Sequence, residues 1–312
     1  MTAMRLWAAE SSHDAGPRIE EVQMPMRGKE CVKPSAALHW VEKMSDTVRI
    51  VVKVGTSTLT YENGKTNLHR MEQICRVLSD LQNRGKEIIL VSSGAIGIGV
   101  GKLGLNSKPA ETEKKQALAA IGQCELMFLY DKFFGEYNQT VAQLLLTKNV
   151  TDAARGKANV QNTFRELIGM GVIPVVNEND TVDTAELEGA NYGDNDMLSA
   201  IVAEIVGADA LIILTDTEGL FDSDPRTNPD AKIIRRVSSV GDEIQKLCGD
   251  SGSNRGTGGM ITKIHAAKYA TEAGIATYIA GGSKPRNLYD ILSGKEVGTY
   301  FSPVLSGKGD SK

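Results

Sequence analysis

The sequence predicts an α/β protein, an αβα sandwich with a mainly parallel central sheet. Between Val48 and Phe301, short runs rich in Val, Ile and Leu alternate with longer stretches whose apolar residues recur at helical spacing. This alternation is typical of a parallel sheet with helices on both faces. Polar segments follow several of the expected strands, and ligands bind at that edge of such sheets. The two observations together predict the fold class and the place of a binding site.

The first expected strand–helix–strand unit rests on clear local signals. Residues 48–54 are rich in β-branched side chains and end at Gly55, which indicates a buried strand. Residues 68–84 carry apolar side chains at helical spacing, and Gly85 ends that helix. A second strand at 87–91 leads directly into Ser92-Ser93-Gly94.

The same alternation continues to the end of the domain. We expect strands at 141–146, 172–176, 210–214 and 276–280, with a last edge strand at 298–301. We expect helices at 114–134, 154–170, 194–205 and 260–273, a hairpin at 181–192 and part of a short helix at 244–247. Residues 1–46, which have three prolines and no sustained periodicity, are expected to form a poorly ordered extension with one short helix at 36–43. The domain then spans 47–302, and 303–312 form a polar, disordered tail.

Composition excludes some classes of partner. The chain has 312 residues with a formal net charge of −4, which gives no general attraction to nucleic acid or anionic membranes. No apolar run approaches the ~20 residues of a membrane span, and the N-terminus lacks the apolar core of a secretory signal. The four cysteines form no Cys-x-x-Cys pair, so we expect free buried thiols in a reduced cytoplasm.

The segment 256–263, Gly-Thr-Gly-Gly-Met-Ile-Thr-Lys, is the strongest local indication of an anion site. Its glycines let several backbone N–H groups converge, and the helix expected to follow places them at a helix N-terminus, where phosphate binds well. Lys263 lies in the first turn of that helix. The pattern is not a P-loop, and a flexible loop before an ordinary helix is the competing interpretation.

Lys53 lies in a strand whose neighbours are apolar. A buried lysine is costly unless it meets an anion, so Lys53 and Lys263 could bracket a transferring phosphoryl group. The competing interpretation is that Lys53 extends from the strand end into water. A carboxylate between two lysines would relieve their repulsion, and Asp194 and Asp196 are the candidates, although simple helix capping would also explain one of them.

Four further polar segments follow expected strands, at 53–57, 92–95, 177–180 and 215–219. Each is consistent with ordinary turn chemistry, but together they favour a shared cleft. Residues 92–101 contain a glycine-rich run without the third glycine of a dinucleotide fingerprint, because position 102 is Lys. A glycine-rich turn that grips a carboxylate through N–H groups fits this run as well.

Taken in order, these motifs resemble the amino acid kinase superfamily and, within it, the members that phosphorylate glutamate. The resemblance covers about residues 48–301 and is carried by segments 51–57, 93–95, 177–180, 193–196, 214–220, 224–226 and 256–263. It implies two lobes, about 47–206 for the amino acid and about 207–302 for ATP. It also implies ATP-dependent phosphorylation of the L-glutamate side-chain carboxylate, with Mg²⁺, as the first step toward proline. A homo-oligomer and feedback inhibition by proline are further family traits.

The resemblance assigns roles by motif. It implies that Lys53 and Lys263 stabilise the phosphoryl group while Asp196 holds the two lysines in place. It implies that glutamate is bound by Ser93, Asp180 and Asn195. ATP would be bound by Lys53, Thr215, Asp216, Thr257, Gly258, Gly259, Met260, Ile261, Thr262 and Lys263, and no residue is assigned directly to a metal. The chain departs from many members because it ends before a C-terminal RNA-binding-like module, and segment 184–192 is slightly long.

Three kinds of alternative stay open at this point. A sibling kinase could act on aspartate, N-acetylglutamate or carbamate, and one methylene is worth only ~1–3 kcal/mol of discrimination. A nucleoside monophosphate kinase would need arginines around the acceptor, and segments 92–95 and 177–180 have none. A non-catalytic sensing module would be expected to lose Lys53, Lys263 or Asp196, and all three are present.

Overall fold

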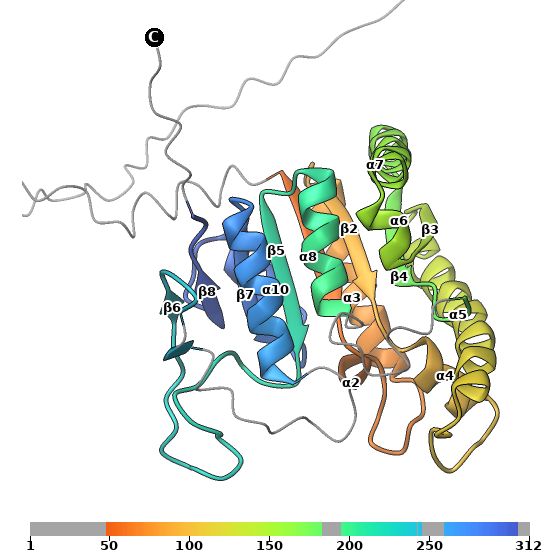
Figure 1. Ribbon diagram of the computed structural model, residues 1–312, viewed down its shortest axis with the longest axis horizontal. Helices are drawn as coiled ribbons and strands as arrows, with labels where there is room; N and C mark the ends of the chain where they lie inside the picture. Colours follow the sequence, from red (N-terminus) through yellow and green to blue (C-terminus); the bar gives the residue numbers. More distant parts are fainter. Residues whose placement is uncertain (1–47, 183–194, 242, 245–258, 305–312) are drawn as a thin grey trace, which may run out of the picture.

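The computed structural model describes residues 48–182, 195–241, 243–244 and 259–304 (Figure 1). The expected extension at 1–46, most of the hairpin at 181–192, most of the short helix at 244–247 and the tail from 305 lie outside these residues. The division into two lobes stays a prediction.

An eight-stranded sheet forms the centre of the fold, in the order β3-β4-β2-β1-β5-β7-β8-β6. All neighbours are parallel except β7 and β8, which run antiparallel. The strands are β1 Arg49–Val54, β2 Glu87–Ser92, β3 Val141–Leu146, β4 Ile173–Glu178, β5 Ala210–Thr215, β6 Arg236–Val237, β7 Ala276–Gly281 and β8 Thr299–Phe301. The mainly parallel α/β fold is confirmed.

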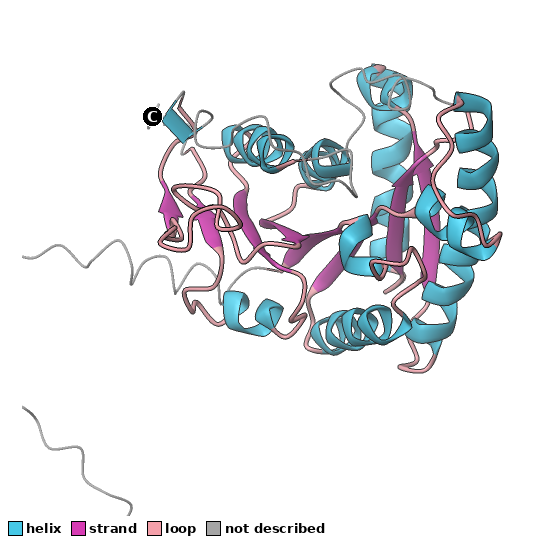
Figure 2. Ribbon diagram, turned by 90° about the horizontal axis from the view of Figure 1, so that it is seen from below, coloured by secondary structure: helices cyan, strands magenta, loops and turns pink. Residues whose placement is uncertain are grey.

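Helices cover both faces of this sheet, as Figure 2 shows. The helices are α2 Thr56–Leu59, α3 Leu68–Asn83, α4 Ala95–Lys102, α5 Thr112–Gly135, α6 Lys148–Asp152, α7 Ala154–Gly169, α8 Asn195–Val206, α10 Met260–Glu272 and α11 Asn287–Leu292. One hydrophobic cluster joins the sheet to α3, α5 and α11, and a second joins it to α7, α8 and α10. The αβα sandwich is therefore confirmed.

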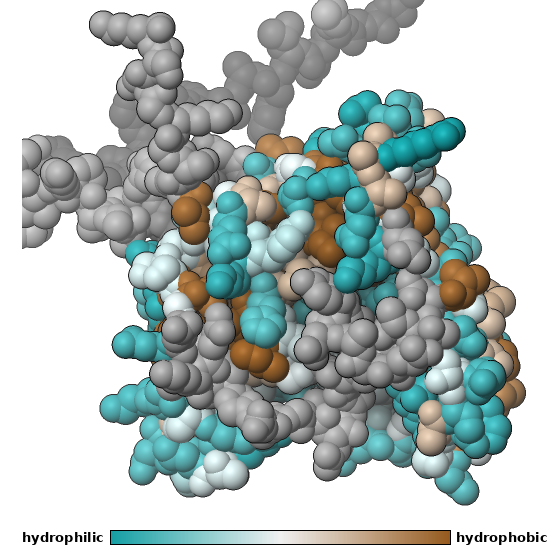
Figure 3. All heavy atoms as spheres, viewed as in Figure 1, coloured by the Kyte–Doolittle hydropathy of each residue, from teal (hydrophilic) through white to brown (hydrophobic). Residues whose placement is uncertain are grey.

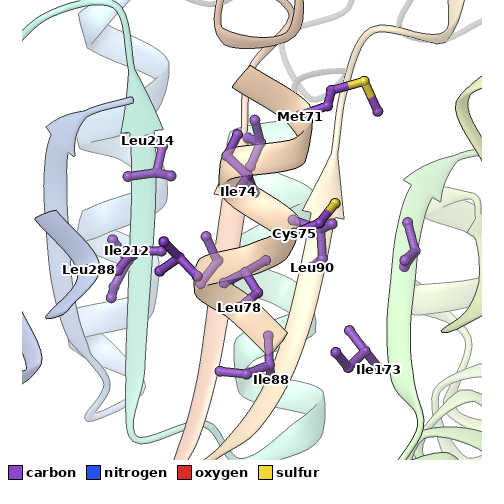
Figure 4. Close-up of a cluster of buried hydrophobic side chains, with 14 of the residues drawn as sticks. Met71, Ile74, Cys75, Leu78, Ile88, Leu90, Ile173, Ile212, Leu214 and Leu288 are labelled. Carbon is purple, nitrogen blue, oxygen red and sulfur yellow. The ribbon is translucent and has the colours of Figure 1, made fainter. Parts of the chain in front are cut away.

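The two clusters take alternate residues of each strand. In Figure 4, Ile74 and Leu78 of α3 lie over the face that carries Leu90 and Ile212. The opposite face carries Val51 and its counterparts, packed under α8 and α10. Because side chains alternate along a strand, Lys53 falls on the same face as Val51. Its position in the strand thus directs it toward α8 and α10.

The outer surface is mainly polar on the side seen in Figure 3, where hydrophobic residues form patches among hydrophilic ones. Within the described residues, none of the helices is both long enough and apolar enough to span a bilayer.

Three expectations are wrong. The run 92–101, interpreted as a glycine-rich turn, is mostly helix: α4 begins at Ala95, directly after Gly94, whose φ is 102°. The last strand, β8, was expected at the sheet edge, but it lies between β7 and β6. Cys75 is buried as expected, whereas Cys124 is exposed. The short elements α2, α6, α11 and β6 are additional to the predicted ones.

Glycines explain why the 95–102 run forms a helix. A Cβ on Gly122 of α5 would lie 1.7 Å from the Ala95 carbonyl oxygen, and one on Gly99 would lie 2.2 Å from the Leu118 carbonyl oxygen. The two helix backbones can approach this closely only because neither position carries a side chain. The glycines therefore serve helix–helix packing directly beside the end of β2.

Candidate active site

A buried ionic cluster of Lys53, Asp196 and Lys263 lies at the centre of the fold; we call it the lysine–aspartate centre. Lys53 Nζ is 2.5 Å from Asp196 Oδ1, and Lys263 Nζ is 3.0 Å from Asp196 Oδ2. The exposed fractions of the three residues are 3% for Lys53, 0% for Asp196 and 7% for Lys263. The structure thus brings together the three residues that the sequence singled out for phosphoryl transfer.

Three different elements supply the centre. Lys53 is the penultimate residue of β1 and sits between Val91 of β2 and Ile213 of β5 in the sheet register. Asp196 is in the first turn of α8, and Lys263 is in the first turn of α10. Helices α8 and α10 pack against each other on the face toward which Lys53 points. Packing of these two helices therefore determines the geometry of the centre.

Electrostatics keeps the Asp196 carboxyl ionised. Burial by itself would raise the pKa of Asp196, but the charges of Lys53 and Lys263 and their hydrogen bonds outweigh it and hold that pKa well below its ordinary value. With both lysines as ammonium groups, the three side chains carry a net charge of +1. Two ammonium groups that converge on one point can interact with a phosphoryl group as well as with the carboxylate between them.

Two neighbouring hydroxyl groups bond to Asp196, one to its carboxylate and one to its backbone. Thr262 Oγ1 donates to Asp196 Oδ2 at 2.9 Å, and it also lies 2.9 Å from the Gly259 carbonyl oxygen. Ser199 Oγ donates to the Asp196 carbonyl oxygen at 2.6 Å. Asp196 is therefore held in one orientation by α10 as well as by its own helix.

The residues expected to bind ATP lie partly at the ends of β5 and α10. Thr215 ends β5, is buried, and donates through Oγ1 to Asp216 Oδ1 at 3.0 Å, while Asp216 itself is exposed. The Gly282 N–H donates to the Thr215 carbonyl oxygen at 2.7 Å, which ties the end of β7 to the end of β5.

At the start of α10, Gly259 is the N-cap, followed by three partly exposed residues, Met260, Ile261 and Thr262. Thr257 and Gly258 lie outside the described residues, as does Asp194.

The residues expected to bind glutamate lie around the ends of β2 and β4. Ser93 follows β2 and is buried, and its N–H donates to the Val54 carbonyl oxygen at 3.0 Å. Asp180 is buried in the turn after β4. Asn195, at the start of α8, donates through Nδ2 to Asn177 Oδ1 at 3.1 Å. Since β2 pairs with β4, these residues gather at one edge of the sheet, next to the lysine–aspartate centre.

Sequence reasoning missed the side chain that continues this polar group. Asn177 Nδ2 donates to Gln123 Oε1 of α5 at 2.8 Å, and both residues are buried. Asn177 belonged to a polar segment singled out by its position after a strand. Gln123 gave no such signal, because it stands in the middle of a long helix and meets Asn177 only through the tertiary fold.

Two lysines that converge at the strand ends of a mainly parallel sheet lie where ligands bind in such folds and are suited to stabilise a transferring phosphoryl group. Two solved structures share the fold. T. acidophilum isopentenyl phosphate kinase matches with a TM-score of 0.56 at 17% identity, covering 81% of this chain and 100% of that one. UMP kinase from Bacillus anthracis matches with a TM-score of 0.56 at 15% identity, covering 82% and 96%.

The family model named Amino acid kinase family matches residues 48–281. The chain belongs to the amino acid kinase family. Glutamate 5-kinase from Clostridium perfringens is 57% identical over 259 residues, which are 83% of this chain and 96% of the relative. Glutamate 5-kinase from Listeria innocua is 50% identical over 84% of this chain and 95% of the relative. The Thermoanaerobacter glutamate 5-kinase is 51% identical, and the match covers 68% of its length.

Proposed function

We propose that this protein transfers the γ-phosphoryl group of ATP to the side-chain carboxylate of L-glutamate, which gives L-glutamyl 5-phosphate and ADP, the first step of proline biosynthesis. The observation that carries the proposal is the lysine–aspartate centre, in which two buried lysines converge on one buried carboxylate. The glutamate 5-kinase relatives at 50–57% identity support glutamate as the acceptor.

The chemistry matches what these residues can supply. A glutamate carboxylate, with an ordinary pKa near 4.3, is already ionised at neutral pH. It attacks the γ-phosphorus, a new carboxyl O–P bond forms, and the bond to the bridging oxygen of ADP breaks, so no strong base is needed. Negative charge on the transferring group is then met by the ammonium groups of Lys53 and Lys263. Asp196 keeps these two ammonium groups together without itself reacting.

The acceptor and nucleotide roles belong to the same proposal. Ser93, Asp180 and Asn195 would bind glutamate, with Asp180 facing its ammonium group. Their place at the ends of β2 and β4, beside Lys53, supports this role. ATP would bind at Thr215, Asp216 and the segment 257–263, so that its γ-phosphoryl group reaches Lys53 and Lys263.

Mg²⁺ would be brought by the nucleotide. Among the described residues no group of three His, Cys, Asp or Glu side chains could hold a metal ion, and Asp196 is engaged by two lysines. Mg²⁺ commonly keeps several waters and binds substrate phosphates with few protein ligands. In a Mg²⁺–ATP complex the ion would supply charge neutralisation for the phosphates, beside the ammonium groups of Lys53 and Lys263.

The proposal also includes a cytoplasmic location, a homo-oligomeric state and feedback inhibition by proline. The competing functions remain phosphorylation of aspartate or N-acetylglutamate and a non-catalytic sensing role. The presence of Lys53, Asp196 and Lys263 in one ion-paired cluster favours catalysis over sensing.

The test is an ATP-dependent hydroxamate assay with three acceptors: L-glutamate, N-acetyl-L-glutamate and L-aspartate. Hydroxylamine traps an acyl phosphate, so the readout depends on the product class proposed here. We expect hydroxamate formation with glutamate at least about tenfold faster than with aspartate, consistent with the discrimination one methylene can provide. Equal rates with all three acceptors, or none with glutamate, would overturn the proposal.

A further inference from the structure

A chain of three buried amide side chains connects α5 to α8 through the end of β4; we call it the amide chain. Gln123 Oε1 accepts from Asn177 Nδ2 at 2.8 Å, and Asn177 Oδ1 accepts from Asn195 Nδ2 at 3.1 Å. The exposed fractions are 8% for Gln123, 1% for Asn177 and 6% for Asn195. Buried polar groups of this kind are costly unless they are hydrogen-bonded, so each contact of the amide chain matters for its stability.

One backbone group sets the direction of the whole amide chain. The Glu178 N–H donates to Asn177 Oδ1 at 2.9 Å. Because a backbone N–H can only donate, the Asn177 oxygen must face it, and its NH₂ group must then face Gln123. Gln123 has to present its oxygen to that NH₂ group, and Asn195 has to present its own NH₂ group to the Asn177 oxygen. The orientation of all three amides follows from this single contact.

With the amides oriented in this way, the amide chain ends in an acceptor on Asn195 and in a donor on Gln123. Asn195 Oδ1 and Gln123 Nε2 are buried and have no hydrogen-bond partner among the described residues. A buried acceptor without a partner lowers stability. The acceptor here belongs to Asn195, which directly precedes Asp196 at the start of α8. A free acceptor there suits an ammonium donor such as that of an amino acid.

The packing of α5 fixes the position of Gln123. Its neighbour Gly122 lies so close to α4 that a Cβ would be 1.7 Å from the Ala95 carbonyl oxygen. Helix α5 is therefore seated against the start of α4, directly after Ser93 and Gly94. Gln123 cannot withdraw from Asn177 without moving the helix.

We propose that Gln123 is a positioning residue for the amino acid substrate, which orients Asn177 and, through it, the Asn195 oxygen. The inference rests on the proposed function, because it takes Asn195 as a glutamate-binding residue. Loss of the Gln123 oxygen leaves Asn177 Nδ2 without its acceptor, so Asn177 no longer holds Asn195 in one orientation. The effect should fall on glutamate binding and not on ATP or on the lysine–aspartate centre.

The experiment measures kcat and both KM values of the full chain for wild type, Gln123→Met and Gln123→Ala. Gln123→Met keeps the length of the side chain but removes the acceptor. Gln123→Ala also removes the acceptor, and because alanine is a good helix former it can replace Gln123→Met in the assay if that variant fails to fold. We expect KM for glutamate to rise about tenfold, the effect of one lost hydrogen bond. We expect kcat and KM for ATP to stay within about twofold, because these interactions act on substrate binding alone.

Two further variants separate positioning from a general structural role. Gln161→Met removes a glutamine that donates to the Ile205 carbonyl oxygen on the α7–α8 side, and it should leave KM for glutamate unchanged. In a protein that already carries Asn195→Ala, adding Gln123→Met should raise KM for glutamate by less than about twofold, because the effects of coupled residues are not additive.

An unchanged KM for glutamate in Gln123→Met, fully additive effects, or equal losses in kcat and both KM values would overturn the inference. An inactive wild type would instead reject the proposed function itself.

Discussion

The lysine–aspartate centre and the amide chain are both buried, both lie at strand ends and both include one residue from the start of α8, yet they are built in opposite ways. In the centre, the side chains are charged, and Asp196 is engaged by two ammonium groups and the Thr262 hydroxyl. In the amide chain there is no charge, and Asn195 has an unpartnered acceptor. The difference teaches that adjacent residues of one helix can be held by different physics, Asp196 by ion pairs and Asn195 by neutral hydrogen bonds, which suits the two different roles proposed for them.

The largest loss of stability should come from removing the carboxylate of the lysine–aspartate centre. Asp196→Asn leaves Lys53 and Lys263 buried without the carboxylate that lies between them. We expect the free energy of unfolding to fall by about 3–5 kcal/mol, the usual result when one partner of a buried ion pair is removed. Urea denaturation measures it.

Asp290→Asn is the control for Asp196→Asn. It removes one partner of the exposed Lys295–Asp290 pair and should cost at most about 1 kcal/mol. An Asp196→Asn variant as stable as Asp290→Asn would mean that the three buried charges do not depend on one another.

A substitution that moves the backbone of α5 should disrupt the amide chain. Gly122→Ala places a methyl group where the Ala95 carbonyl oxygen already lies, so α5 must shift and carry Gln123 away from Asn177. We expect a loss of about 1–3 kcal/mol in unfolding free energy, typical of overpacking, together with a raised KM for glutamate. Gly135→Ala, near the end of the same helix and with open space around it, is the matched control and should be as stable as wild type or more so.

Low pH should affect the lysine–aspartate centre and not the amide chain, because Asp196 can take up a proton and the three amide side chains do not titrate. The folded-state pKa of Asp196 is below its ordinary value near 3.8, so its stabilising contribution is present at neutral pH and is lost as pH falls below about 4. One proton accounts for a slope of up to about 1.4 kcal/mol per pH unit. Wild type should therefore lose stability in acid more steeply than Asp196→Asn, by about that amount.

Gln123→Met should keep the steep slope of wild type, because the amide chain carries no titratable group. Parallel pH profiles for wild type and Asp196→Asn would contradict the assigned ion pairing. Denaturant midpoints between about pH 5 and 2, where a lowered carboxyl pKa acts, supply the measurement.

The sequence predicts the centre better than the amide chain for a physical reason. A lysine in a β-branched strand, or one after a glycine-rich loop at a helix start, is unusual locally, so Lys53 and Lys263 can be identified before their partner is known. Gln123 is an ordinary helix residue, and its meaning depends on a contact with Asn177, 54 positions away. Local pattern contains no information about that contact.

Errors in the predicted fold have similar causes. The glycines of residues 95–102 suggest a turn by propensity, but packing of α4 against α5 selects a helix, because glycine at the crossing admits the partner backbone. Strand β8, expected at the edge of the sheet, lies one position inside it. The two-residue strand β6, too short to show periodicity, pairs with its outer side.

The most direct test of the account is the turnover of Lys263→Ala with glutamate and Mg²⁺–ATP. This substitution leaves the Lys53–Asp196 ion pair in place, so folding should be retained, while one of the two ammonium groups that meet the transferring group is removed. We predict a fall in kcat of about a hundredfold or more, about 3 kcal/mol, with a thermal unfolding midpoint close to that of the control Lys268→Ala. Near-normal turnover in a folded Lys263→Ala protein would contradict the assignment of the lysine–aspartate centre to phosphoryl transfer.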